Sequence, residues 1–159
     1  MQKILLSGKL GEGKYILLDD EDADILGKMK WHLNGGRYPV RGYYEGKKKK
    51  KFYLHRVILN AKKDEQVDHI NGNKLDCRKE NLRICTSLGN NHNRKRSIKN
   101  TSGYKGVTYH KRDQAYQATI KLNYKEIFLG YFKTAKEAAI AYNDAAKKYY
   151  GEFAWLNTI

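Results

Sequence analysis

The chain has 159 residues and a formal net charge of +15 at pH 7, from 32 lysines and arginines against 17 acidic residues. A charge of this size points to a polyanionic partner such as nucleic acid rather than to an acidic small substrate. Two cysteines, Cys77 and Cys85, argue against a disulfide scaffold and fit a reducing compartment. The apolar runs are too short for a membrane span, so we expect a cytoplasmic protein with no membrane association.

The first fifty residues predict a small β-rich unit. Residues 3–6 and 15–18 have the pattern of two strands joined by a glycine-rich turn. The acidic residues 19–24 begin a short helix, where carboxylates complement the helix dipole, so we do not expect this cluster to bind metal. Aromatic residues between Trp31 and Tyr44 suggest a further strand pair. The lysines at 47–51 are expected in an exposed loop, and phosphate contact and simple solubility are equal alternatives for them.

The segment from Val67 to Asn93 carries the most information about function. Asp68 and His69 end a short, partly apolar run that breaks at Asn71-Gly72, which is a strong turn signal. Residues 81–85 alternate polar and apolar side chains and predict a second strand. Thr86 or Ser87 can cap a helix that runs through Asn90 to about Arg96.

The residue types in this segment suit phosphodiester cleavage. That reaction needs a hard cation at the phosphate oxygens and a base that deprotonates water. Asp68 and Asn90 offer oxygen ligands of the kind that Mg²⁺ or Mn²⁺ prefers, and the unperturbed pKa of a histidine such as His69 lies near neutrality. His92 lies about 200° around a helix from Asn90, so the two cannot both face one ion. Spacing favours Asn90 as the ligand and His92 as a neighbour of the DNA backbone, but the choice stays open.

This segment resembles the ββα-metal core of HNH endonucleases, in the variant whose last motif position is asparagine. The resemblance implies that Asp68 and Asn90 hold the metal, that His69 is the general base and that Asn81 holds the His69 loop in shape. Residues 54–59 predict a helix that leads into the hairpin, and a histidine at this place recurs in phage and intron members of the group. His55 therefore either contacts the scissile phosphate or is a capping or core residue. Arg94 and Arg96, near the end of the last helix, are assigned to DNA.

After Arg96 the chain changes character. The polar residues 97–102 predict a linker between a nuclease domain at 1–96, with its core at about 65–96, and a second domain at 103–159. Residues 104–110, 116–122 and 125–132 each alternate with period two and predict three strands. Thr134 and Glu137 form a capping box before a helix at 135–150, which Gly151 ends.

The second domain is similar to the AP2 DNA-binding domain over residues 102–157. The similarity rests on spaced motifs that include Tyr104-Lys105-Gly106-Val107, Leu129-Gly130-Tyr131-Phe132 and Thr134-Ala135-Lys136-Glu137. It implies a three-stranded sheet that enters the major groove with its exposed face. The first strand lacks the family's arginines, so tight binding to GC-rich sites is not implied. By position, the DNA-contacting residues would be Lys105, Thr108, His110, Arg112, Thr119, Lys121, Glu126 and Phe128.

The sequence therefore predicts an α+β protein in which a ββα-metal nuclease domain with a β-rich N-terminal extension precedes an AP2-like sheet packed on one helix. The combination resembles HNH–AP2 homing endonucleases of phages and mobile introns. We expect a metal-dependent enzyme that acts on double-stranded DNA and nicks one strand per visit. The alternative is a DNA-binding regulator whose nuclease is inert. No protein partner is evident, and monomer and dimer both remain open.

Overall fold

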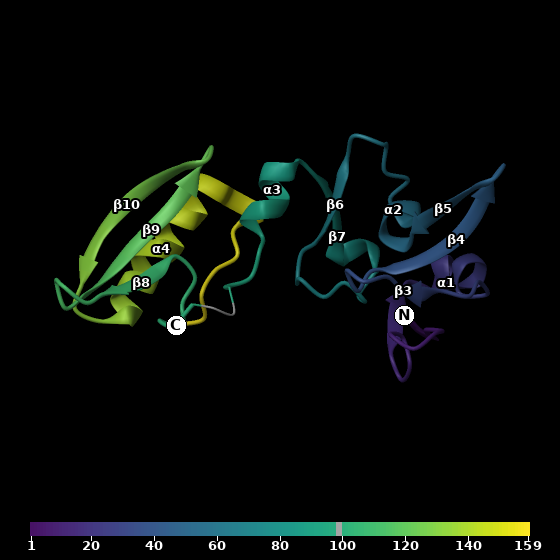
Figure 1. Ribbon diagram of the computed structural model, residues 1–159, viewed down its shortest axis with the longest axis horizontal. Helices are drawn as coiled ribbons and strands as arrows, with labels where there is room; N and C mark the ends of the chain where they lie inside the picture. The colour runs from purple at the N-terminus through teal and green to yellow at the C-terminus, as the bar shows by residue number, and fades with distance from the viewer. Residues whose placement is uncertain (98–99) are drawn as a thin grey trace. The chain divides into compact units, whose positions relative to one another are not determined.

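The computed structural model describes residues 1–97 and 100–159, apart from the side chain of Leu88. The chain forms two compact units, residues 1–86 and residues 87–159, and each is described by itself (Figure 1). In the described residues, the strands form four small sheets of two or three strands each. No helix among these residues is both long and apolar enough to cross a lipid bilayer. The mixed helix and sheet content agrees with the predicted α+β class.

The first unit consists of short antiparallel sheets and short helices. Its strand pairs are β1–β2, β3–β4–β5 and β6–β7. The predicted first strand pair, the helix at the acidic cluster and the helix before the hairpin are all confirmed. The elements are β1 (Gln2–Leu5), β2 (Tyr15–Leu18), α1 (Asp20–Leu26), β3 (His32–Leu33), β4 (Pro39–Glu45), β5 (Lys48–Tyr53), α2 (Leu54–Ile58), β6 (Gln66–His69), the 3₁₀ helix η1 (Lys79–Asn81) and β7 (Leu82–Cys85).

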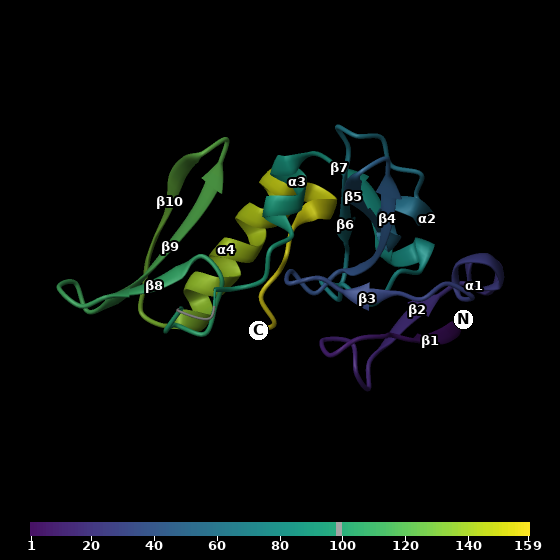
Figure 2. The ribbon, with the colours of Figure 1, turned by 45° about the vertical axis from the view of Figure 1, so that its right-hand side comes forward.

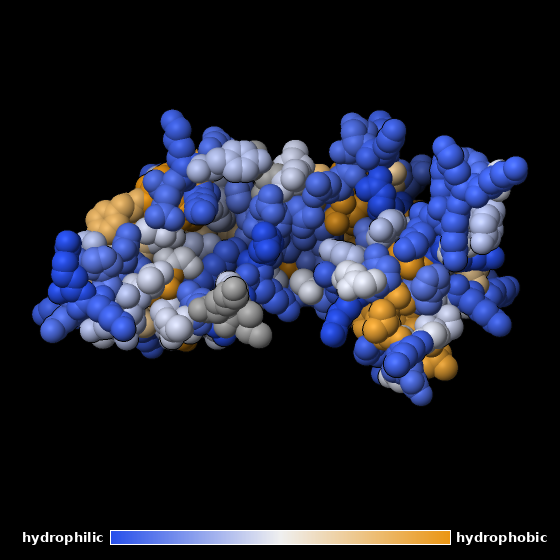
Figure 3. All heavy atoms as spheres, in the orientation of Figure 1, coloured by the Kyte–Doolittle hydropathy of each residue, from blue (hydrophilic) through white to orange (hydrophobic). Residues whose placement is uncertain are grey.

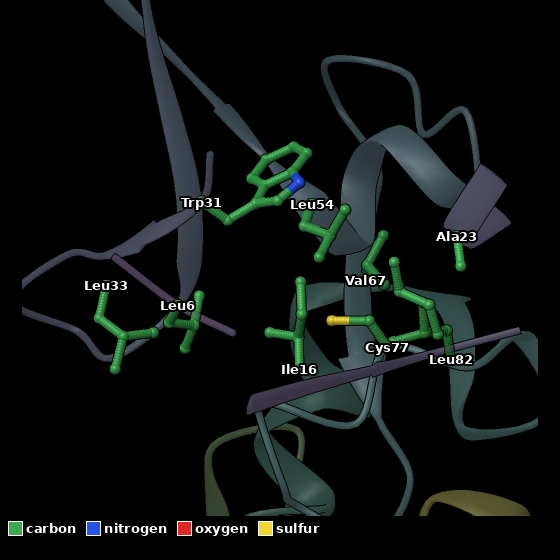
Figure 4. Close-up of a cluster of buried hydrophobic side chains, with 10 residues drawn as sticks. Leu6, Ile16, Ala23, Trp31, Leu33, Leu54, Val67, Cys77 and Leu82 are labelled. Atoms are coloured by element: carbon green, nitrogen blue, oxygen red, sulfur yellow. The ribbon is translucent and has the colours of Figure 1, made fainter. Parts of the chain in front are cut away.

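One hydrophobic cluster holds this unit together (Figure 4). Trp31, Ile16 and Leu54 are almost fully buried in it, and Cys77 supplies a small apolar side chain from the loop between β6 and β7. Strand β2 also pairs with that loop, because Leu17 N donates to Leu75 O and Cys77 N donates to Leu17 O, at 2.8 and 3.0 Å. The N-terminal strands thus support the loop that follows His69.

The predicted loop at Lys47–Lys51 is wrong. Lys48–Tyr53 forms β5, which pairs with β4 in a two-stranded ribbon closed by a turn at Gly46 and Lys47. Pairing with β4 fixes the extended backbone there, although lysine has a low intrinsic strand propensity. Hydrophilic side chains cover the projecting end of this ribbon (Figure 3).

The second unit is a three-stranded antiparallel sheet with a long helix on one face (Figure 2). The sheet order is β10-β9-β8, and Ile120 and Tyr142 lie in the buried layer between the sheet and the helix. The three predicted strands and the predicted helix are confirmed. The elements are α3 (Ser87–His92), β8 (Val107–His110), β9 (Ala115–Leu122), β10 (Lys125–Phe132), α4 (Ala135–Tyr150) and the 3₁₀ helix η2 (Gly151–Phe153).

The ends of the helices agree with the predictions only in part. The capping box of α4 is present in both directions, because Glu137 N donates to Thr134 Oγ1 and Thr134 N donates to the Glu137 carboxylate. Helix α3, in contrast, ends at His92 and not at Arg96. Within the predicted linker, Ile98 and Lys99 lie outside the described residues. The following Ser102 is not part of a free linker, since its hydroxyl donates to Val107 O at 2.8 Å.

Candidate nuclease site

The β6–β7 ribbon presents Asp68 and His69 side by side at the end of β6. The antiparallel register pairs Asp68 with Arg83 and His69 with Leu82. Arg83 donates from Nε and Nη2 to Asp68 Oδ2, at 3.0 and 2.8 Å. Both side chains of this ion pair are largely buried. A buried carboxylate needs such a partner, and the two hydrogen bonds from Arg83 hold Asp68 in one orientation.

The loop between β6 and β7 is held together by hydrogen bonds from Asn81. Its Oδ1 accepts from Asn71 N at 2.9 Å, and its Nδ2 donates to Asp76 O at 2.8 Å. Asn81 is buried, so each bond replaces a solvent contact that is no longer available. The amide thus connects the start of the loop, directly after His69 and Ile70, with its middle.

Asp76 completes the support of this loop. It is 2 % exposed and takes a bidentate pair of hydrogen bonds from Arg78, both at 2.8 Å, and one from Asn71 Nδ2 at 2.9 Å. The Arg78 guanidinium holds the pKa of the Asp76 carboxyl below its ordinary value. Asp76 is therefore an ionised, buried anchor beneath the loop.

His55 and His69 face each other in a pocket of aromatic rings. Their ring centroids are 5.1 Å apart at an interplanar angle of 69°. The Tyr38 ring lies 5.2 Å from His55 and 6.1 Å from His69, and Lys74 Nζ lies 4.2 Å from the centre of the Tyr38 ring. His55 comes from α2, His69 from β6 and Tyr38 from the segment just before β4. The two predicted histidines thus meet although fourteen positions separate them.

Both imidazoles are held in the neutral form. Burial lowers the pKa of His69 to about 4, although the nearby Asp68 and Asp76 carboxylates act in the opposite direction. Burial likewise lowers the pKa of His55 to about 3, with further lowering from His69 and Arg56. Nδ1 of His55 is buried and has no hydrogen-bond partner among the described residues. At neutral pH each ring therefore keeps a lone pair that can accept a proton.

Asn90 and His92, the two candidates for the remaining metal ligand, lie on α3 in the second unit. Within that unit the His92 ring stacks on Tyr150, with 3.7 Å between centroids and an interplanar angle of 10°. Helix α3 also packs on η2, where the Phe153 ring lies close to Gly89. Asn90 as a metal ligand, and the placement of α3 on the β6–β7 ribbon, remain predictions.

Six of the predicted DNA-contacting residues share the outer face of the second unit's sheet. The register pairs Thr108 with Gln117, Glu126 with Lys121 and Phe128 with Thr119. Paired residues lie on the same face of an antiparallel sheet, and the helix α4 covers the opposite face with Ala118 and Ile120 beneath it. The six are Thr108, His110, Thr119, Lys121, Glu126 and Phe128.

The remaining predicted DNA contacts lie elsewhere in the unit. Lys105 precedes β8, is half-buried and donates from Nζ to His92 O at 2.6 Å, so it does not belong to the open face. Arg112 is exposed in the β8–β9 turn, where it pairs with Asp113. Arg94 and Arg96 are exposed after α3, and Arg96 Nη1 donates to Asn100 O at 3.1 Å.

Sequence reasoning missed three residues of the candidate site. Arg83 could have been found from the hairpin, because antiparallel pairing of the two predicted strands brings it opposite Asp68. Asp76 could have been suspected as an acidic residue two positions before Arg78. Tyr38 carries no local signal, since only the folding of α2, β4 and β6 brings it to the two histidines.

Asp68 and His69 lie next to each other on a β-ribbon, and Asn81 braces the loop that follows them, which is the arrangement that the sequence predicts for a nuclease site. Residues 52–92 match the family model described as HNH endonuclease. The chain is also 31 % identical over 151 residues to "Uncharacterized HNH endonuclease L560" of Acanthamoeba polyphaga mimivirus, which covers 94 % of this chain and 78 % of that protein. The chain belongs to the HNH endonuclease family, whose members are hydrolases that cleave DNA.

A second relative is shorter. "Protein 3.8" of Escherichia phage T7 is 35 % identical over 60 residues, which is 38 % of this chain and 50 % of that protein. No solved structure matches this chain.

Proposed function

We propose that this protein is a metal-dependent DNA endonuclease in which His69 is the general base. The observation that carries the proposal is the His69 ring itself, which is buried beside Asp68, neutral at neutral pH and backed by the Asn81-braced loop. A base of this kind must be unprotonated before it can take a proton from water. The depressed pKa of His69 keeps it in that state throughout the neutral range.

The residues fit a hard divalent cation with few protein ligands. A carboxylate and an amide oxygen, from Asp68 and Asn90, are the donors that Mg²⁺ and Mn²⁺ accept, and Mg²⁺ normally keeps water or substrate oxygens in its other positions. In residues 1–97 and 100–159, no group of three or more His, Cys, Asp or Glu side chains could hold a metal. The proposed site has one carboxylate and one amide as its protein ligands, so it does not require such a group. When bound, the cation would neutralise charge on the phosphate and on the leaving oxygen.

The protein's own groups carry the proton transfer. His69 would remove a proton from the attacking water, so that the water oxygen bonds to phosphorus while the bond from phosphorus to the 3′ oxygen breaks. Arg83 holds the Asp68 carboxylate in place. His55, opposite His69, would lie against the scissile phosphate and exclude water from one side of the base. Asn81 would keep the backbone after His69 in the required conformation.

The second unit would dock the nuclease on its target. Its sheet exposes one face with polar, basic and aromatic side chains, and such a face can present side chains to base edges and phosphates of a duplex. The similarity to AP2 domains and the spacing of the sheet residues support this assignment. A single nuclease site cuts one strand per visit, so a monomer would produce nicks. We further assign the protein to the homing type, on its resemblance to HNH–AP2 enzymes of phages and mobile introns.

Supercoiled plasmid distinguishes this enzyme from an inert DNA-binding regulator. The purified full chain is incubated with plasmid in Mg²⁺, in Mn²⁺ and in EDTA, and the open-circular and linear forms are separated on a gel. The proposal predicts open-circular product with Mg²⁺ or Mn²⁺ and intact plasmid with EDTA. Plasmid that is bound but stays supercoiled with either cation would instead establish the regulator.

A further inference from the structure

Lys74, in the loop between β6 and β7, carries a positive charge that no acidic residue neutralises. Its Nζ donates to Gly36 O at 2.8 Å and lies over the Tyr38 ring, 4.2 Å from the ring centre. In the described parts of the chain, no carboxylate forms an ion pair with it. A carbonyl oxygen and an aromatic ring are neutral groups, so they leave the charge of Lys74 uncompensated and open to an anion.

The backbone around Lys74 is fixed by hydrogen bonds. Asn73 Oδ1 accepts from Leu75 N, and Asn73 O accepts from Asp76 N, both at 3.1 Å. Leu75 O accepts from Leu17 N of β2 at 2.8 Å. The lysine side chain therefore starts from an ordered loop, which lowers the entropy cost of holding it against a bound group.

A closed turn between β3 and β4 supplies the two groups that Lys74 contacts. Asn34 Oδ1 accepts from Tyr38 N at 2.9 Å, and Asn34 N donates to Tyr38 O at 3.1 Å. These bonds close the turn that contains Gly36 and Tyr38. The ammonium group is thus held between two ordered segments instead of moving freely at the end of a flexible side chain.

The same Tyr38 ring packs beside both histidines of the candidate site. Its centroid lies 5.2 Å from that of His55 and 6.1 Å from that of His69. The ammonium of Lys74 over this ring is therefore close to the proposed general base. All four residues belong to the unit formed by residues 1–86.

We propose that Lys74 is a catalytic residue of the nuclease, which donates to a non-bridging oxygen of the scissile phosphate, and that Tyr38 is the residue that positions it. An ammonium bonded to Gly36 O keeps two further N–H groups for an anionic oxygen. The proposed cation has few protein ligands, so a second positive charge would share the stabilisation of the charge that develops on the phosphate in the transition state. This role of Lys74 rests on the proposed function.

Removing the charge of Lys74 should slow cleavage more than it weakens binding. Lys74→Gln should lower the single-turnover rate of plasmid nicking in Mg²⁺ by about 10- to 100-fold. This is less than the roughly 10²–10³ of an enclosed oxyanion donor, because water screens a partly exposed cation. Duplex affinity, measured by fluorescence anisotropy, should change far less, since only one phosphate contact among many is lost.

Lys63→Gln is the matched control. It removes the same charge from an exposed position in the loop between α2 and β6, and should keep the wild-type rate. A wild-type rate for Lys74→Gln would overturn the role of Lys74 and leave the proposed function intact. A wild-type chain that nicks no plasmid in Mg²⁺ or Mn²⁺ would overturn the proposed function, and the role of Lys74 with it.

Chemical modification separates the charge of Lys74 from its structural contacts. In Lys74→Cys, the introduced thiol is alkylated with bromoethylamine, which restores an ammonium at the length of lysine, or with iodoacetamide, which adds a neutral amide. Cys77 and Cys85 are buried, and burial raises the pKa of the Cys77 thiol to about 12, so the introduced thiol reacts first. The wild-type chain treated with each reagent is the control.

The two adducts should differ in nicking rate while their melting temperatures agree. The ammonium adduct should recover most of the rate lost in Lys74→Cys, and the amide adduct should not. Equal rates for the two adducts would overturn the catalytic role and leave Lys74 as a structural contact between the loop and the turn.

A double-mutant cycle tests the positioning role of Tyr38. Tyr38→Phe keeps the ring under the ammonium and should nick at close to the wild-type rate. Tyr38→Leu removes the ring, so it should slow nicking, and it should do so less in the Lys74→Gln background than in the wild type. The same slowing in both backgrounds would show that Tyr38 does not act through Lys74.

Discussion

At the scale of single residues, the pairing of His55 with His69 decides how the candidate site responds to pH. Each ring is buried, His69 lowers the pKa of His55 further, and the Tyr38 ring packs beside both. A histidine in water would be half protonated at pH 6.5. Here both stay neutral well below that pH, so the proposed base needs no prior deprotonation.

The His55–His69 pair makes the stability of the fold depend on pH. The folded-state pKa values are about 3 for His55 and about 4 for His69, against 6.5 for an ordinary histidine. Below pH 6.5 the unfolded chain therefore binds more protons than the folded chain. The free energy of unfolding that comes from burying the two neutral rings is fully present above pH 6.5 and is lost progressively as the pH falls to about 4. Thermal melts between pH 7 and pH 5 should show a smaller loss for His55→Gln than for the wild type. His32→Gln, on β3, is the control, and an unchanged loss in His55→Gln would contradict this account.

Substitutions of Asn81 and Asp68 should have different effects, the first on stability and the second on DNA cleavage. Asn81→Ala removes one buried and one partly buried hydrogen bond, to Asp76 O and from Asn71 N, so it should destabilise the protein by about 1–3 kcal/mol. Asp68→Asn keeps the side-chain shape but removes the charge proposed to bind the cation, so it should lose Mg²⁺-dependent nicking. Urea denaturation without metal and plasmid nicking measure the two effects. Asn81→Ala with wild-type stability would leave Asn81 without its bracing role.

Asp68→Ala is a poorer probe of metal binding than Asp68→Asn. Removing the carboxylate completely would leave the largely buried Arg83 guanidinium without its ion-pair partner. Breaking a buried ion pair on one side destabilises the fold strongly. Loss of nicking in that variant would then combine loss of fold with loss of chemistry.

At the scale of elements, helix α4 shows how local sequence sets a boundary. Thr134→Ala removes the side chain that accepts from Glu137 N, and should destabilise the protein by about 0.5–2 kcal/mol. Thr134→Ser keeps the hydroxyl and serves as the control. Both are measured by urea denaturation. Equal stabilities for the alanine and serine variants would mean that packing of the helix on the sheet, and not its cap, fixes the start of α4.

Elements with a strong periodic pattern could be predicted from the sequence. The alternation in residues 115–132 and the small residues along α4 are local signals, and the strands and helix lie where these signals indicate. The strand at Lys48–Tyr53 could not be predicted, because five lysines carry no alternation and their conformation depends on pairing with β4. The end of α3 at His92 was missed for a similar reason, since packing on η2 and the His92–Tyr150 stack lie outside the local sequence.

The residues of the candidate site that belong to the sequence motif could be predicted. Asp68, His69 and Asn81 follow from spacing, and His55 from its position before the hairpin. Their surroundings did not follow, because Tyr38 and the buried Asp76–Arg78 pair come from segments brought together only by folding. Lys105, predicted among the DNA-contacting residues, lies away from the open sheet face because its side chain donates to a carbonyl oxygen at the end of α3, and its contact with DNA stays a prediction.

At the scale of the whole molecule, the two units divide the proposed work between them. The first contains His69, Asp68 and the loop that supports them, and the second contains the exposed sheet face. The net charge of +15 would bring the molecule to DNA without regard to sequence. The sheet would then select a site, and the nuclease unit would cut near it.

The most direct test of the central claim compares His69→Ala with the wild type under single-turnover conditions, with Mg²⁺ and with enzyme in saturating excess over the plasmid. Because His69 is assigned the removal of a proton from water and no share of affinity, the nicking rate should fall by about 10²–10⁴, while duplex binding stays at the wild-type level. His32→Ala is the matched control, and melts of both variants check that the fold is retained. A His69→Ala protein that nicks plasmid at the wild-type rate would contradict the assignment of the general base and with it the proposed mechanism.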